Sequence, residues 1–314
     1  MLEKQTIEIV TPARLHFGFL ELNKNINSFG GIGLSIDKFN TKIKLKKNLR
    51  LEYKGKYTDK ASFFLKTFCK KMKIKPNFLL NIEQCSSKHI GLGSGTQLAL
   101  SIGTAIAKLE NKTVNPEKIA KILNRGLRSK VGLISFIHGG FLIDLKTRNK
   151  FFNDIGKVFF PENWKIILIK DKIQGMHGKS EINAFKKASS FNTKNIKMTD
   201  LILQKIYPSL IENNFSEFAK TITKIQNIMG KYFNSFQGGI YSSNRVGKVL
   251  NFLKKENVLG FGQTSWGPSG FAFFPNIKKA KKMKQKLKKR FSSCNNLEFI
   301  ICSGKNSGAD IQIK

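Results

Sequence analysis

The sequence predicts an α+β protein whose two domains pack around a shared cleft. The chain has 314 residues, enough for two domains of ordinary size, and 40% of them are hydrophobic, enough for a core. In the first half, strand-like runs alternate with stretches that have helical spacing of apolar residues. A polar stretch at 147–156 separates this half from a second series of helices and strands. We therefore expect domains at 1–157 and 158–314.

The first expected domain contains four strands, a glycine-rich turn and three helices. The strands are expected at 6–18, 33–37, 42–46 and 78–83. The turn is expected at 30–33. Apolar spacing predicts helices over 62–72 and 97–109. A third helix begins after Asn115, a favourable N-cap that is followed by Pro116 at the first helical position.

The second expected domain begins and ends with strands. The strands are expected at 164–169, 259–263, 270–274, 297–302 and 309–313, and the helices at 200–213, 215–233 and 243–256. The cation-rich stretch at 278–290 has Ala280, Met283 and Leu287, together with Ile277 just before it, on one helical face. This spacing favours an amphipathic helix that covers a sheet, with its lysines in solvent, over a surface that binds a polyanion.

The charge of the chain points to an anionic partner. Lys and Arg together number 56 and Asp and Glu 20, which gives a net charge of +36. Only seven of these cations are Arg, whereas proteins that bind nucleic acid rely on Arg for bidentate and stacked contacts. We therefore expect an anionic small-molecule substrate and no nucleic acid. A basic RNA-binding protein stays as the alternative from another class.

The cysteines and the N-terminus indicate a cytoplasmic protein. Cys69, Cys85, Cys294 and Cys302 form no CxxC pair and have no His at metal-ligand spacing, so neither a disulfide framework nor structural zinc is expected. The first residues contain no apolar leader, and no run reaches the 18 apolar residues of a membrane span. We expect reduced thiols and no membrane partner.

The strongest local signal is Gly91-Leu-Gly-Ser-Gly-Thr-Gln97, between an expected strand and an expected helix. Glycines let the backbone approach a ligand closely, and the helix N-terminus offers N–H groups and a positive dipole end. Ser94 and Thr96 add hydroxyl donors. The spacing matches neither a Walker A loop nor a dinucleotide fingerprint. The pattern therefore favours a phosphate site, although a glycine-rich turn without a ligand has the same sequence signature.

Two further segments place cations where an anion could bind. Arg14 and His16 alternate with Leu15 and Phe17, so on a strand they point to one face. Arg125 and Arg128 are two of the seven arginines and suit bidentate contacts to phosphate or carboxylate. The alternatives are an ordinary polar strand face and a solvated helix end.

A fourth segment, Gly262-Gln-Thr-Ser-Trp-Gly-Pro-Ser-Gly270, is a polar glycine-rich turn between two expected strands. Turns of this composition on a rigid scaffold often contact ligands. Trp266 could stack on an aromatic substrate. The alternative is a hairpin turn whose Trp packs on the core.

In this order, the motifs resemble the GHMP superfamily of small-molecule kinases, and most closely its branch of β-ribofuranosylaminobenzene 5′-phosphate synthases from methanopterin biosynthesis. The resemblance covers residues 7–275. The matching segments are Arg14-Leu-His16, Gly30-Gly31, Gly91-Leu-Gly-Ser-Gly-Thr-Gln97, Arg125-Gly-Leu-Arg128-Ser129, Gly139-Gly-Phe141, Tyr232-Phe233 with Gln237-Gly-Gly239, and Gly262-Gln-Thr-Ser-Trp-Gly-Pro268.

The resemblance implies a GHMP-kinase-like fold, in which a ferredoxin-like domain at 158–314 completes a cleft beside the phosphate loop of domain 1–157. It also implies a decarboxylating C-ribosyltransferase. Such an enzyme joins 5-phosphoribosyl 1-diphosphate to 4-aminobenzoate or 4-hydroxybenzoate at the ring carbon that carries the carboxylate, and carbon dioxide and diphosphate leave. Magnesium is expected with the diphosphate, no ATP is required, and a homodimer is left open.

The same resemblance suggests roles for individual residues. The catalytic candidates are Arg14, His16 and Arg128. The phosphate and diphosphate candidates are Gly91, Leu92, Gly93, Ser94, Gly95, Thr96, Gln97 and Arg125. The substrate candidates are Gln263, Ser265 and Trp266. No metal ligand is identified, and which arginine holds carboxylate and which holds phosphate stays open.

Two departures from the kinase pattern argue against phosphoryl transfer. Kinases of this superfamily that use a base carry an Asp shortly before the Gly-Gly strand, whereas residues 118–143 contain no Asp or Glu. The second Ser of the kinase loop, often near magnesium, is Gly95 here. An ATP-dependent small-molecule kinase is therefore the alternative function rather than the expected one.

Overall fold

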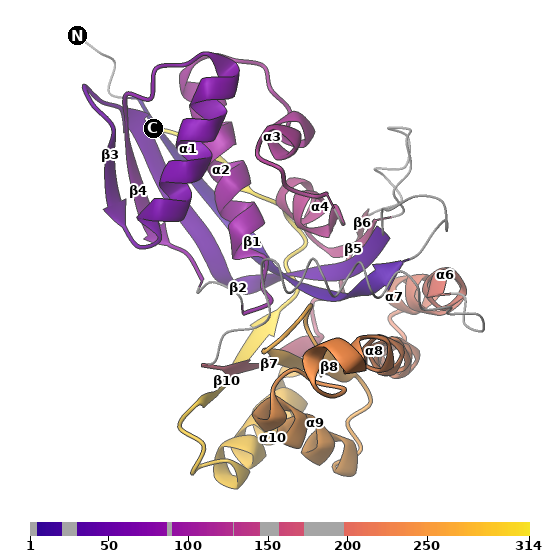
Figure 1. The fold of residues 1–314 in the computed structure, drawn as a ribbon. Helices are drawn as coiled ribbons and strands as arrows, with labels where there is room; N and C mark the ends of the chain where they lie inside the picture. Colours follow the sequence, from indigo (N-terminus) through magenta and orange to yellow (C-terminus); the bar gives the residue numbers. More distant parts are fainter. Residues whose placement is uncertain (1–4, 21–29, 87–89, 128, 145–156, 173–197) are drawn as a thin grey trace.

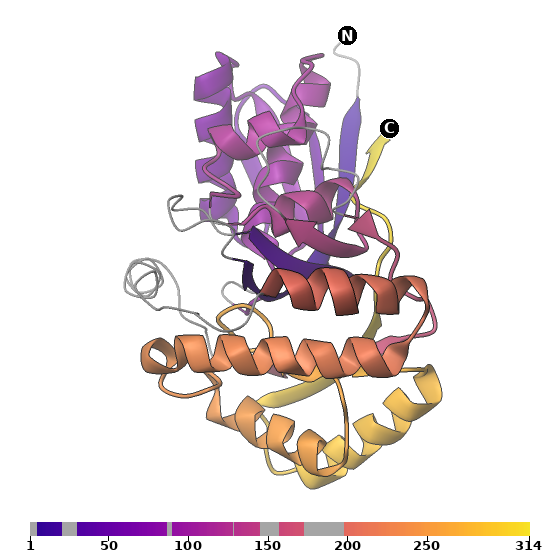
Figure 2. The same cartoon turned by 90° about the vertical axis from the view of Figure 1, so that its right-hand side faces the viewer.

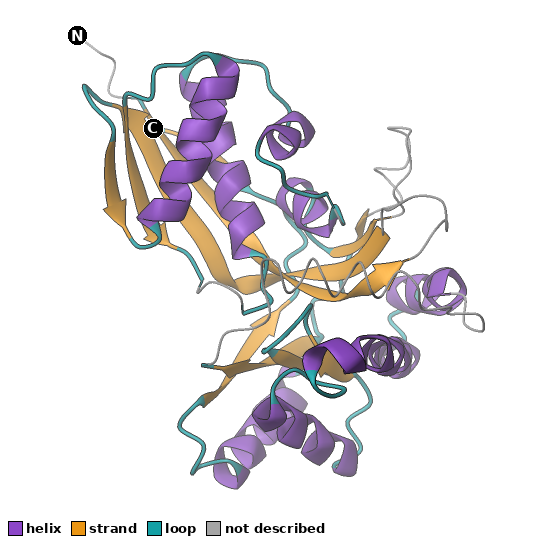
Figure 3. Ribbon diagram, in the orientation of Figure 1, coloured by secondary structure: helices purple, strands orange, loops and turns teal. Residues whose placement is uncertain are grey.

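The computed structural model describes residues 5–20, 30–86, 90–127, 129–144, 157–172 and 198–314. Two sheets lie one above the other, with helices against both (Figures 1 and 3). The expected α+β class with two packed units is confirmed. In the part of the chain that is described, no helix is both long and apolar enough to cross a membrane.

The first sheet is built mainly from the N-terminal half of the chain. Its central strands β1 (Thr6–Leu20) and β2 (Gly30–Lys47) pair antiparallel along most of their length. The other strands are β3 (Glu52–Gly55), β4 (Phe78–Gln84), β5 (Phe141–Asp144), β6 (Lys157–Val158) and β11 (Asp310–Ile313). The main path runs β11-β1-β2-β4-β3, while β5 pairs with β2 and β6.

Four helices accompany this sheet (Figure 1). They are α1 (Thr58–Met72), α2 (Ser94–Leu109), α3 (Pro116–Ile122) and α4 (Val131–Ile137). Three of them contact its strands, and α3 packs mainly on the other three helices. Helix α2 is the most buried, because small and aliphatic residues cover most of its circumference. The expected N-cap of α3 is confirmed, since Asn115 Oδ1 accepts a hydrogen bond from Lys118 N at 2.9 Å.

The second sheet is antiparallel and runs in the order β10-β7-β9-β8. Its strands are β7 (Lys165–Asp171), β8 (Phe261–Gln263), β9 (Gly270–Phe274) and β10 (Leu297–Ser303). Helices α9 (Asn244–Lys255) and α10 (Ile277–Arg290) cover its outer face. Helix α8 (Phe215–Gln237) lies toward the first sheet, beside α6 (Met198–Leu201), a π-helical turn (Ile202–Ile206) and α7 (Tyr207–Ile211) (Figure 2).

One hydrophobic core joins the two sheets. Phe17 of β1 contacts Phe271 and Phe273 of β9, with ring centroids 5.0 and 5.8 Å apart. Alternation along β7 divides its side chains between two cores: Ile166 and Leu168 face this shared core, whereas Ile167 and Ile169 face α9 and α10. The shared core fixes the position of β1 against the loop between β8 and β9.

The expected domain boundary after residue 157 stays a prediction. The two sheets are not divided strictly at this residue. Strand β11, the last of the chain, returns to pair with β1 in the first sheet. Glu8 of β1 secures this end, because its carboxylate lies 2.7 Å from Lys314 Nζ and 2.9 Å from Lys42 Nζ.

The amphipathic interpretation of α10 is confirmed. Ala280, Met283 and Leu287 are buried, while the lysines of the helix surround them on the solvent side. Ile277, which the sequence also aligns with this face, is 41% exposed because it is the first residue of the helix. The four cysteines carry no disulfide, as expected.

The expected turn at 30–33 is wrong. These residues begin β2, which continues as one strand to Lys47. Its pairing with β1 shifts register at two places: β2 has extra residues at 37–40, opposite Pro12, and β1 has one extra residue at Phe17. The glycines permit close packing instead of a turn. A methyl group on Gly31 would lie 2.6 Å from Ser129 Oγ, and one on Gly33 would lie 2.5 Å from the carbonyl oxygen of Leu15.

Candidate active site

The glycine-rich loop leads into helix α2, which begins at Ser94. Gly91 and Gly93 adopt φ angles of +81° and +79°, a left-handed conformation that side chains other than glycine rarely adopt. The N–H groups of Thr96 and Gln97 both donate hydrogen bonds to the carbonyl oxygen of Gly93, at 3.1 and 3.3 Å. The loop therefore presents the positive end of a mostly buried helix, the geometry that binds phosphate.

Arg14 holds this loop against strand β1. Its Nη1 donates to the carbonyl oxygen of Gly91 at 2.8 Å, and its backbone N–H donates to that of Leu92 at 3.1 Å. A methyl group on Gly93 would lie 3.1 Å from the guanidinium carbon of Arg14. The expected alternation along β1 is confirmed, because Leu15 and Phe17 enter the core.

Two more cations reach the first turn of α2. A methyl group on Gly95 would lie 2.7 Å from Lys60 Nζ of helix α1 and 3.5 Å from Arg125 Nη2. Arg125, which follows α3, also lies over the ring of Phe64, 5.8 Å from its centroid. The sequence indicated Arg125 but not Lys60, which no local pattern distinguishes from the other lysines.

The loop between β8 and β9 is fastened to both the phosphate loop and β1. Thr264 Oγ1 donates to the carbonyl oxygen of Gly91 at 2.9 Å and accepts from the N–H of His16 at 2.9 Å. The N–H of Ser265 donates to the carbonyl oxygen of His16, also at 2.9 Å. Thr264 is fully buried. These bonds place segments near residues 16, 91 and 264 side by side, a link that sequence analysis did not find.

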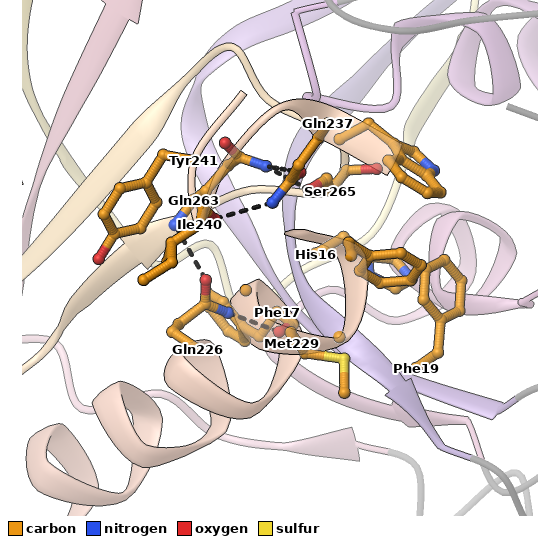
Figure 4. A pocket seen from close by; sticks show the side chains of 14 residues that line it. His16, Phe17, Phe19, Gln226, Met229, Gln237, Ile240, Tyr241, Gln263 and Ser265 are labelled. Atoms are coloured by element: carbon orange, nitrogen blue, oxygen red, sulfur yellow. Dashed lines mark hydrogen bonds between the residues drawn. The ribbon is translucent and has the colours of Figure 1, made fainter. Parts of the chain in front are cut away.

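A pocket lies beside the hydrogen bonds that join the segments near residues 16, 91 and 264 (Figure 4). Its cavity measures about 30 Å³ and opens to solvent. Among the described residues that line it, none has a side chain charged at neutral pH; they are His16, Phe17, Gly18, Phe19, Gln226, Met229, Gly230, Phe233, Gln237, Ile240, Tyr241, Gln263, Ser265 and Trp266. Burial first, and the charge of Arg14 second, lower the pKa of His16 well below its ordinary value.

Gln263 forms part of the pocket wall, and its amide is engaged with other protein groups. Its Oε1 accepts from the N–H of Ser242 at 2.8 Å, and its Nε2 donates to Gln237 Oε1 at 3.2 Å (Figure 4). Its backbone N–H donates to Gln226 Oε1 at 2.9 Å, and Gln226 in turn donates to the carbonyl oxygen of Phe17 at 2.5 Å. This network fixes helix α8 against the loop, so Gln263 shapes the pocket.

The sequence left open whether Trp266 contacts a ligand or packs on the core, and the structure places it both in a small core and at the pocket. It is 5% exposed and packs on Phe233, with ring centroids 4.4 Å apart. Phe19, Met229, Tyr232 and Phe236 pack against this pair. Trp266 also lines the pocket together with Ser265. The aromatic cluster is thus a small core with one side on the pocket.

Three loop candidates support the loop by packing: Gln97 and Leu92 are buried, and Thr96 is half-buried. Gln97 is fully buried and its Nε2 donates to the carbonyl oxygen of Gly132 at 2.8 Å. A methyl group on Gly132 would lie 3.2 Å from the methyl carbon of Thr96, so this residue also packs on α4. The side chain of Leu92 lies in the shared core. Arg128, a catalytic candidate, lies outside the described residues.

Asp144, at the end of β5, was not expected at the site. It is 2% exposed and accepts from the N–H of Lys130 at 2.5 Å and from Ser129 Oγ at 3.2 Å. These bonds fix the chain just before α4. At this place Ser129 Oγ and His16 Nε2 both lie close to Gly31. Asp144 therefore positions the segment that follows Arg125.

Among the described residues, no cage of protein ligands for a magnesium ion is formed. No group of three or more His, Cys, Asp or Glu side chains comes together among them. The charged side chains nearest to Gly93 and Gly95 of the phosphate loop are Arg14, Lys60 and Arg125, which are cations and cannot ligate a metal ion.

Comparison with known sequences adds a family relationship. The GHMP kinases N terminal domain family matches residues 59–140. The "Beta-ribofuranosylphenol 5'-phosphate synthase" of Methanocaldococcus jannaschii is 32% identical over 297 residues, covering 84% of this chain and 88% of the relative. The protein of the same name from Archaeoglobus fulgidus is 27% identical over 238 residues, covering 71% and 76%.

Solved structures show the same fold at low identity. The mevalonate kinase of Methanococcus jannaschii superposes with a TM-score of 0.64 at 17% identity, covering 95% of this chain and 98% of that one. The mevalonate diphosphate decarboxylase of Staphylococcus aureus gives 0.65 at 12% identity, covering 98% of each chain. At these identities the likeness concerns the fold alone.

Proposed function

The chain belongs to the family of beta-ribofuranosylphenol 5'-phosphate synthases, and on this basis we propose that it is a decarboxylating C-ribosyltransferase. The proposed reaction joins 5-phosphoribosyl 1-diphosphate to 4-hydroxybenzoate or 4-aminobenzoate, with release of carbon dioxide and diphosphate. Its place is methanopterin biosynthesis. The relatives are named for a phosphorylated riboside of a phenol, which fits a product made in this way.

One observation carries the proposal: a cationic phosphate loop and an uncharged aromatic pocket adjoin along strand β1. Arg14 contacts the loop, and His16, two residues later, lines the pocket. Thr264 bonds to both segments. Two substrates of opposite chemistry, a phosphorylated sugar and a benzene ring, would therefore meet at this junction.

The donor would bind with its diphosphate on the loop. The first turn of α2 offers N–H groups, and Arg14 and Arg125 offer guanidinium groups near Gly93 and Gly95. These groups stabilise negative charge that develops on the diphosphate as its bond to the ribosyl carbon breaks.

The acceptor ring would enter the pocket beside Trp266 and Phe19. A carboxylate is poorly accommodated among uncharged side chains, because its burial without a cation is costly. The hydroxyl or amino group would therefore point inward, toward the amides of the pocket wall, and the carboxylate outward, toward Arg14. This orientation brings the ring carbon that carries the carboxylate toward the donor.

The chemistry needs no strong base at the first step. The ring carbon attacks the ribosyl carbon as the diphosphate leaves with the electron pair of its carbon–oxygen bond. The hydroxyl or amino group opposite donates electrons into the ring and stabilises the cationic adduct. The bond to the carboxylate then breaks, its electron pair restores aromaticity, and carbon dioxide departs. A magnesium requirement stays a prediction.

The decisive experiment supplies carboxyl-labelled 4-hydroxybenzoate and 4-aminobenzoate with and without 5-phosphoribosyl 1-diphosphate. Labelled carbon dioxide should appear only when the donor is present, together with an equal amount of diphosphate. Release of phosphate from ATP with no labelled carbon dioxide would instead favour the small-molecule kinase. Running each arm with and without added magnesium tests the metal requirement.

A further inference from the structure

The pocket beside Trp266 is smaller than the ring that the proposed reaction would place in it. Its cavity measures about 30 Å³, which is room for about two water molecules, whereas an apolar cavity that holds benzene measures about 150 Å³. A side chain of the wall must therefore move when an aromatic ring enters. Which side chain moves, and how far, decides which rings the pocket accepts.

Much of the described pocket wall is held in place by specific contacts. The side-chain amides of Gln226 and Gln263 both form hydrogen bonds to other protein groups. The ring of Trp266 packs on that of Phe233, with the centroids 4.4 Å apart. Moving any of these side chains would break hydrogen bonds or aromatic contacts, so they are poorly suited to make room for a ligand.

Met229, on helix α8, is held differently. A thioether is at most a weak hydrogen-bond acceptor, so packing holds this side chain in the wall, beside the aromatic cluster of Phe233 and Trp266 (Figure 4). Met229 is only partly buried, and its unbranched side chain adapts to irregular spaces. Gly18 provides the room that it fills, because a methyl group on Gly18 would lie 2.7 Å from Met229 Cγ and 3.0 Å from Sδ.

The helix also relates Met229 to one end of the ring. Gln226 lies one turn earlier on α8, and both residues line the pocket. Gln226 is one of the amides toward which the hydroxyl or amino group of the acceptor would point. The ring position next to that group is therefore the one that meets Met229.

We propose that Met229 is a specificity-determining residue for the acceptor. Its side chain occupies part of the space that the ring takes, turns aside for a benzoate with a single hydroxyl or amino group, and excludes rings with a methyl group next to that group. The ring that enters contacts the polarisable sulfur, which is a favourable partner for an aromatic ring. The inference rests on the proposed function, because that function places a benzoate in this pocket.

The primary test compares binding of 4-hydroxybenzoate and 4-hydroxy-3-methylbenzoate to the full chain by calorimetry. The parent should bind the smaller ring more tightly. Met229→Ala should reduce this preference, measured as the ratio of the two Kd values, about tenfold, the discrimination that one methyl group produces in a fitted apolar pocket.

Ile240→Ala is the matched control. It removes as many side-chain atoms as Met229→Ala from another part of the pocket wall, where Ile240 is 46% exposed and lies beside Gly230. Because a mostly solvated side chain does not limit the size of the ring, this variant should change the ratio less than about twofold.

A second variant keeps the size of the side chain and removes its mobility. Isoleucine has a similar volume to methionine, but a β-branched side chain on a helix is confined almost entirely to one χ1 rotamer. Met229→Ile should therefore bind 4-hydroxybenzoate about tenfold more weakly than the parent. Its melting temperature without ligand should fall by no more than about 4 °C, because the substitution conserves volume.

Two results would overturn the inference: a Met229→Ala variant with the same preference as the parent, or a Met229→Ile variant that binds 4-hydroxybenzoate as tightly as the parent. Failure of the proposed function looks different. If the parent binds neither benzoate and releases no labelled carbon dioxide, the reaction and the inference both fail. If the parent converts 4-hydroxybenzoate but Met229→Ala and Ile240→Ala show the same ratio of Kd values, the inference about Met229 alone fails.

Discussion

The two halves of the candidate site differ in charge although they are joined by consecutive hydrogen bonds. Near Arg14 of β1, the cations Arg14, Lys60 and Arg125 gather around the loop at α2. Farther along β1, from His16 on, uncharged amides and aromatic rings form the pocket around Trp266. The net charge of +36 therefore does not by itself indicate which ligands bind or where. A few cations form one half of the site, and the other half contains uncharged side chains.

The largest expected effect is a loss of turnover when a residue in the charged half of the site is substituted. Gly93→Val would require a branched side chain at φ +79°, with its first carbon 3.1 Å from the Arg14 guanidinium. Steady-state turnover should fall about 100-fold or more, because several contacts to the leaving group are lost together. Without ligand the melting temperature should fall only modestly. If 5-phosphoribosyl 1-diphosphate still stabilises the variant as it does the parent, the diphosphate does not bind at this loop.

A substitution in the aromatic half should affect stability as well as binding. Trp266→Ala removes a ring that packs on Phe233, and its free energy of unfolding should fall by about 3 kcal/mol. Trp266→Phe keeps an aromatic ring and should stay folded while it raises KM for the acceptor severalfold. Thermal unfolding and acceptor titrations separate the two effects. A Trp266→Ala variant as stable as the parent would show that the ring is not part of a core.

The neutrality of the pocket predicts a pH dependence. Burial holds the pKa of His16 well below its ordinary value, so His16 stays uncharged over about pH 6 to 8. The profile of kcat/KM in this range should contain no ionisation that disappears in His16→Gln. Because the unfolded chain takes up the proton more readily, His16 lowers stability as the pH falls below its unfolded pKa. An ionisation near neutral pH that His16→Gln abolishes would contradict an uncharged pocket.

The smallest effect concerns a charge cluster remote from the site, at β1 and β11. Hydrogen bonds from Lys314 and then from Lys42 lower the pKa of Glu8 from 4.5 to about 2. Its stabilising effect is present above the unfolded value and is lost as the pH falls toward 2. Glu8→Gln should therefore unfold more easily than the parent at neutral pH, with the difference shrinking in acid. Turnover of the variant should match the parent, which makes it a control for charge removal outside the site.

What the sequence predicted well is local. The spacing of glycines in 91–95 placed the loop at the start of a helix, and the alternation of Arg14 and His16 with apolar residues placed both on one strand face. Each pattern depends only on neighbours in the chain. The same local reasoning misread 30–33 as a turn, because Gly31 and Gly33 meet residues from distant segments rather than turning the chain.

What the sequence could not predict depends on distant contacts. Lys60 is one of 49 lysines, and only the packing of α1 on α2 brings it to Gly95. Thr264 bonds to Gly91, 173 residues earlier in the chain, and to His16, 248 residues earlier. The burial of Gln97 against α4 likewise follows from tertiary packing. Patterns that specify a backbone conformation can be found in a single sequence, whereas side chains that converge from separate elements cannot.

In this account the phosphorylated donor binds in the charged half of the site and the benzoate in the aromatic half. The most direct test of this assignment measures KM for both substrates in two variants. Release of labelled carbon dioxide is followed while each substrate is varied in turn, in Lys60→Met and in Trp266→Phe. The account predicts that Lys60→Met raises KM for 5-phosphoribosyl 1-diphosphate and leaves KM for the benzoate unchanged, and that Trp266→Phe does the reverse. If Lys60→Met instead raises KM for the benzoate alone, the cationic loop holds the carboxylate and the assignment of the two halves is wrong.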